Sequence, residues 1–172
     1  RGSDYRSGFA TVRDVVMHHP DSPPVAALLG RASEQFARLF IDGEADALPP
    51  VEALSLYYDF RQFTPPGAQG DEMIRNLARR LGAVDLLQQA GDLLQYQVEK
   101  RLKGAAQAQV ATELAAIRLA DRQPEAALRV LNASALAELP PTLERQRRVL
   151  EARALIDAGR YDLALDMLSR LD

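Results

Sequence analysis

Residues 150–168 read LEARALIDAGRYDLALDML, and the fold class can be predicted from their pattern. Gly159 separates two runs in which apolar residues recur at three- and four-residue steps, a pattern that predicts two helices joined by a tight turn. Ala152 and Ala164 fall where the two helices would meet, because alanine lets helix backbones approach closely. The stretch therefore predicts an antiparallel helical hairpin.

A second copy of this pattern precedes the first. Leu114 and Ala115 come about a dozen residues before Ala127, as Ala152 comes before Ala164, and the two copies lie about 37 residues apart. We expect all four alanines to be buried between helices, where a bulky replacement would overpack the contact. The C-terminal part of the chain is thus expected to repeat one hairpin.

Helices are expected along the rest of the chain as well. Alanine, leucine and arginine dominate, strand formers are sparse, and proline and glycine divide the sequence into helix-sized segments. The predicted helices cover residues 4–19, 23–42, 50–63, 71–81, 86–102, 108–120, 125–134, 141–158 and 161–171. The proline-rich stretch 64–70 is a candidate internal boundary. We nevertheless expect one domain over residues 1–172, built as a continuous array.

The spacing G-x-Y-x-x-A of Gly159, Tyr161 and Ala164 resembles the tetratricopeptide repeat, a helix-turn-helix unit of about 34 residues. The N-terminal stretch resembles the second half of another such unit, and the matching positions are Tyr5, Gly8, Val12, Val15 and Pro20. The resemblance thus implies a chain that begins in mid-repeat, and we expect it to be a fragment of a larger protein. The resemblance implies an all-α fold in which antiparallel helix hairpins stack as a TPR-like right-handed α-solenoid. It is weak over residues 25–102, where Leu87 would occupy a small-residue position, and HEAT-like or other helical-hairpin stacks are the near alternatives.

The first helix needs a cover for its apolar side. Phe9, Val12 and Val15 lie on one face of it, and a half repeat lacks the helix that would precede it. We expect either the following helix, with Leu28, Phe36 and Phe40, or a second copy of the chain to bury this face. Self-association is therefore one expected outcome.

Composition excludes several classes of protein. The 172 residues are 47% hydrophobic and carry a formal net charge of -3, so the chain has a core to bury and no bulk attraction for nucleic acid or anionic membranes. Apolar runs are too short to span a bilayer, and cysteine is absent, which excludes disulfides and thiolate metal sites. We expect a soluble segment of a bacterial protein, of the cytoplasm or the periplasm.

Catalytic and cofactor motifs are missing from the sequence. It contains no phosphate-binding glycine loop and no nucleophile elbow. His18 and His19 are adjacent, so on a helix they point about 100° apart and cannot share one metal ion. Acidic residues alternate at positions 42, 44 and 46 as calcium ligands do, but Ala47 and Ala53 stand where that loop requires glycine and glutamate. We expect no metal, no cofactor and no enzymatic activity.

Two kinds of side-chain cluster remain. The densest basic spots are expected to be solvated helix faces because acidic residues dilute them; they comprise Arg79, Arg80, Arg145, Arg147 and Arg148. An aromatic cluster at helical spacing is expected in the core, with an exposed binding surface as the alternative. Its members are Tyr57, Tyr58, Phe60 and Phe63.

These patterns favour a non-catalytic protein-protein interaction scaffold that binds a polypeptide on a concave helical surface. The alternative is a helical accessory region of a larger enzyme or cell-envelope assembly protein; a nucleic-acid-binding solenoid and a self-contained enzyme are less favoured. The resemblance places the first helix of each pair on the inner surface. The partner-binding residues it implies are Gln109, Thr112 and Ala116 in one unit, and Gln146, Val149, Arg153 and Asp157 in the next.

Overall fold

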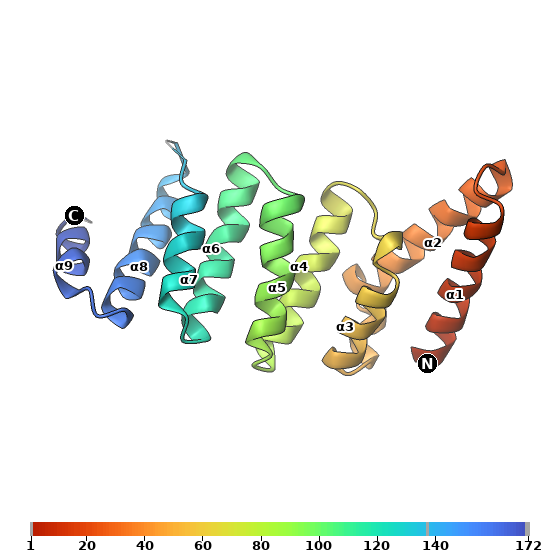
Figure 1. Ribbon diagram of the computed structural model, residues 1–172, viewed down its shortest axis with the longest axis horizontal. Coiled ribbons are helices and arrows are strands. Elements are labelled where there is room, and N and C mark those ends of the chain that lie inside the picture. The colour runs from red at the N-terminus through yellow and green to blue at the C-terminus, as the bar shows by residue number, and fades with distance from the viewer. Residues whose placement is uncertain (1, 137, 171–172) are drawn as a thin grey trace. The chain divides into compact units, whose positions relative to one another are not determined.

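The computed structural model describes residues 2–136 and 138–170, which hold nine α-helices, two short 3-10 helices and no strand (Figure 1). The all-α prediction is confirmed for these residues. The chain divides into two compact units, Arg1–Val84 and Asp85–Asp172. The proline-rich stretch 64–70 lies inside the first unit.

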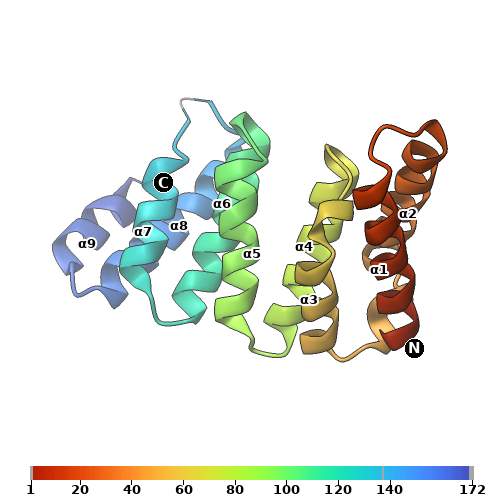
Figure 2. The same ribbon diagram turned by 45° about the vertical axis from the view of Figure 1, so that its right-hand side comes forward.

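The first unit contains α1 (Gly2–His18), α2 (Pro23–Ile41), α3 (Pro50–Asp59) and α4 (Ala68–Ala83), together with the 3-10 helices η1 (Glu44–Ala47) and η2 (Arg61–Phe63). Proline begins both α2 and α3, since its fixed φ and missing N–H suit the first helical turn. Helix α2 packs against both α1 and α4, and α3 packs against α4 (Figure 2).

Aromatic rings form the core of the first unit. Phe9 of α1 meets Phe36 of α2 edge-on, with the ring centroids 5.3 Å apart, and lies 5.6 Å from the rings of both Phe60 and Phe63. Helix α2 and the segment that ends α3 thus cover Phe9, so the expected cover by the following helix is confirmed for this residue, whereas Val12 and Val15 are only half-buried. The core assignment is confirmed for Tyr57, Phe60 and Phe63, whereas the Tyr58 side chain is 41% exposed.

The structure corrects two details of this region. The helix predicted over 50–63 ends at Asp59, and residues 61–63 form a 3-10 turn that brings Phe63 into the core. Arg80 does not lie on a freely solvated face. Its Nη1 donates to the carbonyl oxygen of Ala45 (3.1 Å) and its Nη2 to that of Leu48 (2.7 Å). This arginine therefore fixes η1 on α4.

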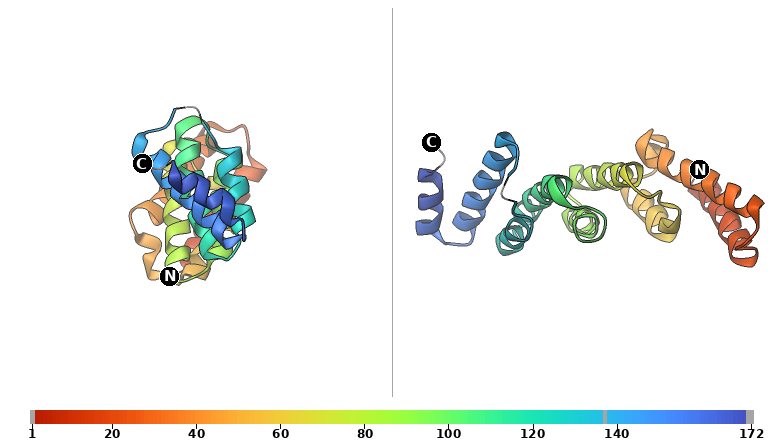
Figure 3. Two further views of the ribbon diagram at one scale, coloured as in Figure 1. Left: turned by 90° about the vertical axis from the view of Figure 1, so that its left-hand side faces the viewer. Right: turned by 90° about the horizontal axis from the view of Figure 1, so that it is seen from above.

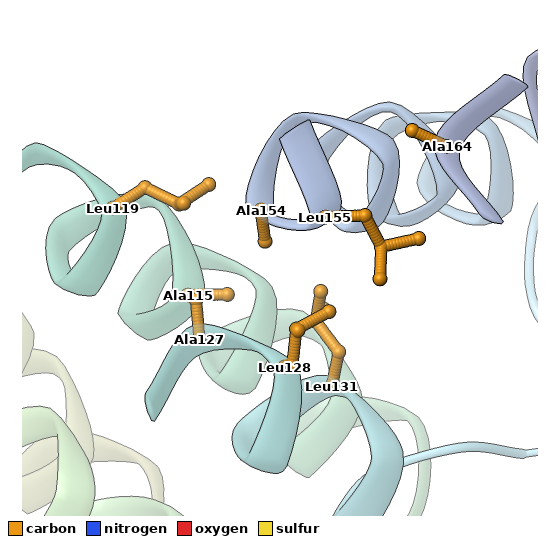
Figure 4. Close-up of a cluster of buried hydrophobic side chains, with 8 residues drawn as sticks. All are labelled: Ala115, Leu119, Ala127, Leu128, Leu131, Ala154, Leu155 and Ala164. Carbon is orange, nitrogen blue, oxygen red and sulfur yellow. The ribbon is translucent and has the colours of Figure 1, made fainter. Parts of the chain in front are cut away.

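The second unit contains α5 (Leu87–Lys100), α6 (Gly104–Ala120), α7 (Pro124–Ala133), α8 (Pro141–Asp157) and α9 (Tyr161–Ser169). Each helix packs against the next, and α6 also packs against α8 (Figure 3). Small side chains lie in the contacts between helices: Ala115, Ala127, Ala152 and Ala164 are all buried, which confirms the prediction for these four alanines. Figure 4 shows Ala115, Ala127 and Ala164 in one cluster with leucines of α6, α7 and α8.

One turn geometry recurs along the chain. Asp85, Arg122 and Gly159 all have left-handed φ, at 62°, 59° and 79°, and they follow one another at the interval of about 37 residues. After the last two, the next amide closes the preceding helix: Gln123 N donates to Arg118 O, and Arg160 N donates to Leu155 O. Helices begin two residues after each left-handed residue, at Leu87, Pro124 and Tyr161.

The same interval extends the alanine pattern toward the N-terminus. Ala78 precedes Ala115 and Ala90 precedes Ala127 at this spacing, and both are buried. Ala90, rather than Leu87, therefore holds the small-residue position in α5. We call this spacing the repeat interval. In sequence, it relates positions of α4, in the first unit, and of α5, in the second unit, to those of the two hairpins that the sequence identified.

Candidate binding surfaces

The residues predicted to contact a partner lie on α6 and α8. Gln109 and Gln146 are separated by the repeat interval, and so are Ala116 and Arg153, which places each pair on the same face of equivalent helices. All four are exposed, as are Asp157 and Val149, whose side chain is 48% exposed. We call these six residues the α6–α8 strip.

Thr112 is the exception among the predicted contact residues. It is only 1% exposed, and its hydroxyl donates to the carbonyl oxygen of Ala108 within α6. The same hydroxyl accepts a hydrogen bond from Arg147 of α8. Thr112 therefore belongs to the interior of the unit and cannot contact a partner directly.

Arg147 is the buried cation that holds α6, α7 and α8 together. Its Nη1 donates to Ala108 O and Thr112 Oγ1, both at 3.1 Å. Its Nη2 donates to Leu131 O at 2.8 Å and to Ser134 Oγ at 3.1 Å, at the end of α7. The prediction that Arg147 lies on a solvated face is wrong, because the residue is only 8% exposed.

The electrostatics of Arg147 follow from this burial. Loss of water lowers the pKa of its guanidinium, and the negative charge of Glu151 raises it in part. Burial thus disfavours the charged form, and the four hydrogen bonds offset that cost. Arg147 is a structural group rather than a binding group.

A recess of about 570 Å³ opens in the second unit, and its size is within the range of about 300–1,000 Å³ typical of ligand sites. Helices α5, α6 and α7 line it with polar and small apolar side chains. The lining residues used below are Gln88, Gln95, Gln107, Gln123, Arg118 and Arg129, with Val98, Glu99, Ala126, Val130 and Ala133. None of the predicted contact residues lines this recess.

Arg118 is the most buried charge in the recess. It is 7% exposed, and its Nη2 lies 3.6 Å from Oδ1 of Asp92, a distance too long for a hydrogen bond. The same carboxylate oxygen accepts a hydrogen bond from Gln88 at 2.9 Å. Asp92 is therefore a weak counter-ion for this guanidinium.

Gly91 makes room for Arg118. A β-carbon at position 91 would stand 2.5 Å from Nη1 of Arg118. At the repeat interval, Arg118 corresponds to Leu81 and Leu155, and Gly91 corresponds to Leu128. The chain thus replaces a buried leucine by arginine and removes the side chain that would collide with it. This paired departure from the repeat is the signal by which the sequence could have identified the recess.

The glutamines of the recess are oriented by their amide nitrogens. Gln95 Nε2 donates to Glu99 Oε1 at 2.7 Å, and Gln107 Nε2 donates to Val98 O at 2.8 Å. Like Gln88, each has its nitrogen engaged within the unit. Their side-chain carbonyl oxygens are the atoms that can accept from a ligand.

Other candidate groups lie apart from these surfaces. His18 ends α1, and its Nδ1 lies 2.7 Å from Asp14 O. Across residues 2–136 and 138–170, no group of three or more histidine, aspartate or glutamate side chains is placed to hold a metal ion. Within those same ranges, every helix is too short or too polar to traverse a bilayer.

A scan of protein-family models, a search of curated proteins and a search of solved structures return no match to this chain. Its function is therefore inferred from the α6–α8 strip and the recess.

Proposed function

We propose that this chain is a non-catalytic protein-interaction module, a TPR-like right-handed α-solenoid that holds a polypeptide. The observation that carries the proposal is the repeat interval, because it brings equivalent positions of successive hairpins to the same face. Gln109 and Gln146 illustrate this, one on each of two equivalent helices. Such a face offers similar contacts at regular steps, which suits a partner that is itself a chain.

The charges of the α6–α8 strip support the same proposal. Arg153 and Asp157 are exposed one turn apart on α8, and Val149 adds an apolar side chain one turn earlier. A polypeptide supplies charged, polar and apolar groups in close succession, so it matches this mixture better than a uniformly charged polymer does. The strip and the recess are two separate surfaces on which a polypeptide can be held.

A displayed library of random peptides, panned against the full chain, tests this function. The affinity of each enriched peptide is then measured by fluorescence anisotropy, both for the wild-type chain and for the double variant Arg153→Glu, Asp157→Arg. The control is Asp162→Arg, an exposed charge reversal on α9. All variants should keep their helicity and melting temperature, because exposed substitutions shift stability by about 0.5 kcal/mol or less.

The outcomes separate the function from the surface that performs it. Failure to enrich any peptide that binds the purified chain would contradict the proposed function. Peptides that bind the wild-type chain and lose affinity only with the double variant assign the contact to the α6–α8 strip. If the double variant binds the peptides as tightly as the wild-type chain does, the α6–α8 strip is excluded as the contact surface and the recess remains.

A further inference from the structure

We propose that the recess between α5, α6 and α7 receives a carboxylate of an extended polypeptide, and that Arg118 is the residue that binds it. The inference rests on the proposed function, because it names the chemical group and the place at which the polypeptide is held. It is carried by the unused hydrogen-bond donors of Arg118, by the residues that line the recess and by the balance of charge in that lining.

Arg118 is buried but poorly paired. Within the part of the chain that the structure describes, its guanidinium has one ionic partner, Asp92 at 3.6 Å, and donates no hydrogen bond. Arg147, the buried arginine with a structural role, differs from Arg118 because its guanidinium donates hydrogen bonds to four acceptors. No nitrogen of Arg118 is among the buried side-chain atoms that lack a hydrogen-bond partner, so the donors that it does not use face the open volume of the recess. The unused donors of Arg118 are therefore best explained as donors to a ligand.

The ligand that fits a guanidinium in this position is a carboxylate. The guanidinium presents N–H groups in a planar fork that matches the two oxygens of a carboxylate, and such paired hydrogen bonds are short and strong. Gly91 permits this group to lie close against α5, since any β-carbon there would collide with it. The recess thus holds one arginine in a fixed orientation at its wall.

The remaining walls fit a peptide backbone and its side chains. Gln88, Gln95 and Gln107 present side-chain carbonyl oxygens that can accept from backbone N–H groups. Small apolar side chains of α7 leave space for an apolar residue next to the carboxylate. These are Ala126, Val130 and Ala133.

The charge of the recess limits the ligand to few negative groups. Arg129 is a second cation in the lining, but Glu99 is an anion in the same lining and Asp92 lies beside Arg118. A polyanion such as nucleic acid would meet both carboxylates. A peptide with one carboxylate, either an acidic side chain or its C-terminus, satisfies Arg118 with less repulsion than a polyanion would meet.

An array of synthetic octapeptides tests the inference. Each sequence is made in four forms, with glutamate or glutamine at one central position and with a free or amidated C-terminus. We expect the binding forms to lose affinity by about tenfold or more when the relevant carboxylate is neutralised, as for the loss of one charge-assisted pair. The exchange of glutamate for glutamine tests a side-chain carboxylate, and amidation of the C-terminus tests the terminal carboxylate.

Two phenylalanine variants locate the site. Ala126→Phe fills the recess from a half-buried position of α7, and Ala116→Phe places the same side chain on the exposed α6–α8 strip. The inference requires that Ala126→Phe abolish binding, whatever the effect of Ala116→Phe. Arg118→Gln should weaken only the carboxylate forms, and if this buried substitution impairs folding, the four peptide forms still test the carboxylate on the wild-type chain.

The opposite results overturn the inference. If Ala116→Phe blocks binding and Ala126→Phe does not, the recess is excluded while the proposed function stands. If Ala126→Phe blocks binding but all four peptide forms bind equally, the carboxylate assignment is wrong. If none of the octapeptides binds the wild-type chain, the carboxylate site is wrong, and the library experiment decides separately whether the chain binds polypeptides.

Discussion

Arg118 and Gly91 lie so close that a β-carbon on residue 91 would stand 2.5 Å from Nη1 and 2.9 Å from Cζ of the arginine. The contact joins the wall of α5 to a cation of α6. Glycine inside a helix lowers helix stability by about 1 kcal/mol relative to alanine. The close contact with Arg118 explains why glycine nevertheless occupies position 91.

Gly91→Ala is predicted to move the Arg118 guanidinium. The gain in helix propensity should be offset by the displaced side chain, so the free energy of unfolding should change little. Gly30→Ala is the control, because position 30 is a helix-interior glycine with open space around it. It should raise the free energy of unfolding by about 0.5–1 kcal/mol. Denaturant unfolding measures both, and an equal gain in the two variants would show that the arginine does not constrain position 91.

Arg147→Ala is predicted to destabilise the second unit by about 3 kcal/mol. The substitution removes the donor to Leu131 O and Ser134 Oγ and leaves a cavity among three helices. Arg145→Ala changes an exposed arginine of the same helix and should shift stability by about 0.5 kcal/mol or less. Denaturant unfolding followed by circular dichroism compares them. If both variants lose a similar free energy of unfolding, the hydrogen bonds of Arg147 are not what stabilises the second unit.

Ala90→Phe and Ala127→Phe are predicted to cost about 1–3 kcal/mol each, because both alanines are buried at equivalent positions of the repeat. Ala116→Phe is the control on an exposed face of α6. The melting temperature of the control should equal that of the wild-type chain, and those of Ala90→Phe and Ala127→Phe should be lower. A stable Ala90→Phe variant would show that the repeat interval does not extend to α5.

Arg122→Gly is predicted to stabilise the chain. Arg122 has φ of 59°, a conformation that costs a residue with a β-carbon about 1–2 kcal/mol and costs glycine much less. The equivalent turn already has Gly159, with φ of 79°, so Gly159→Ala should destabilise by about 1 kcal/mol. Opposite shifts of the melting temperature in these two variants are the expected result. Shifts of the same sign would mean that the two turns are not equivalent.

The helices were predictable because their signals are local. Pro23, Pro50, Pro124 and Pro141 each open a helix, and the buried alanines at 115, 127, 152 and 164 could be placed from spacing alone. The break after Asp59 was missed because Phe63 is drawn into the core by Phe9, which is far away in the sequence. Such a tertiary contact leaves no periodic signal in the chain.

The binding surfaces were less accessible to sequence analysis. Arg147 was assigned to solvent because charged residues usually lie there, yet its acceptors come from two other helices, as far along the chain as Ala108. Thr112 was misplaced because its assignment came from the resemblance, which gave no sign that Arg147 of another helix would reach its hydroxyl. The recess combines residues of three helices, and only the comparison of Gly91 and Arg118 with their repeat equivalents points to it.

The hydrogen bonds of Arg147 have a consequence for local unfolding. Helix α8 cannot separate from α6 and α7 without leaving the guanidinium unpaired and uncovering two backbone carbonyls at once. The hairpins on either side of this residue should therefore open together rather than one after the other. In native-state hydrogen exchange, the amides of α6, α7 and α8 should share one free energy of opening, and Arg147→Ala should split it into two.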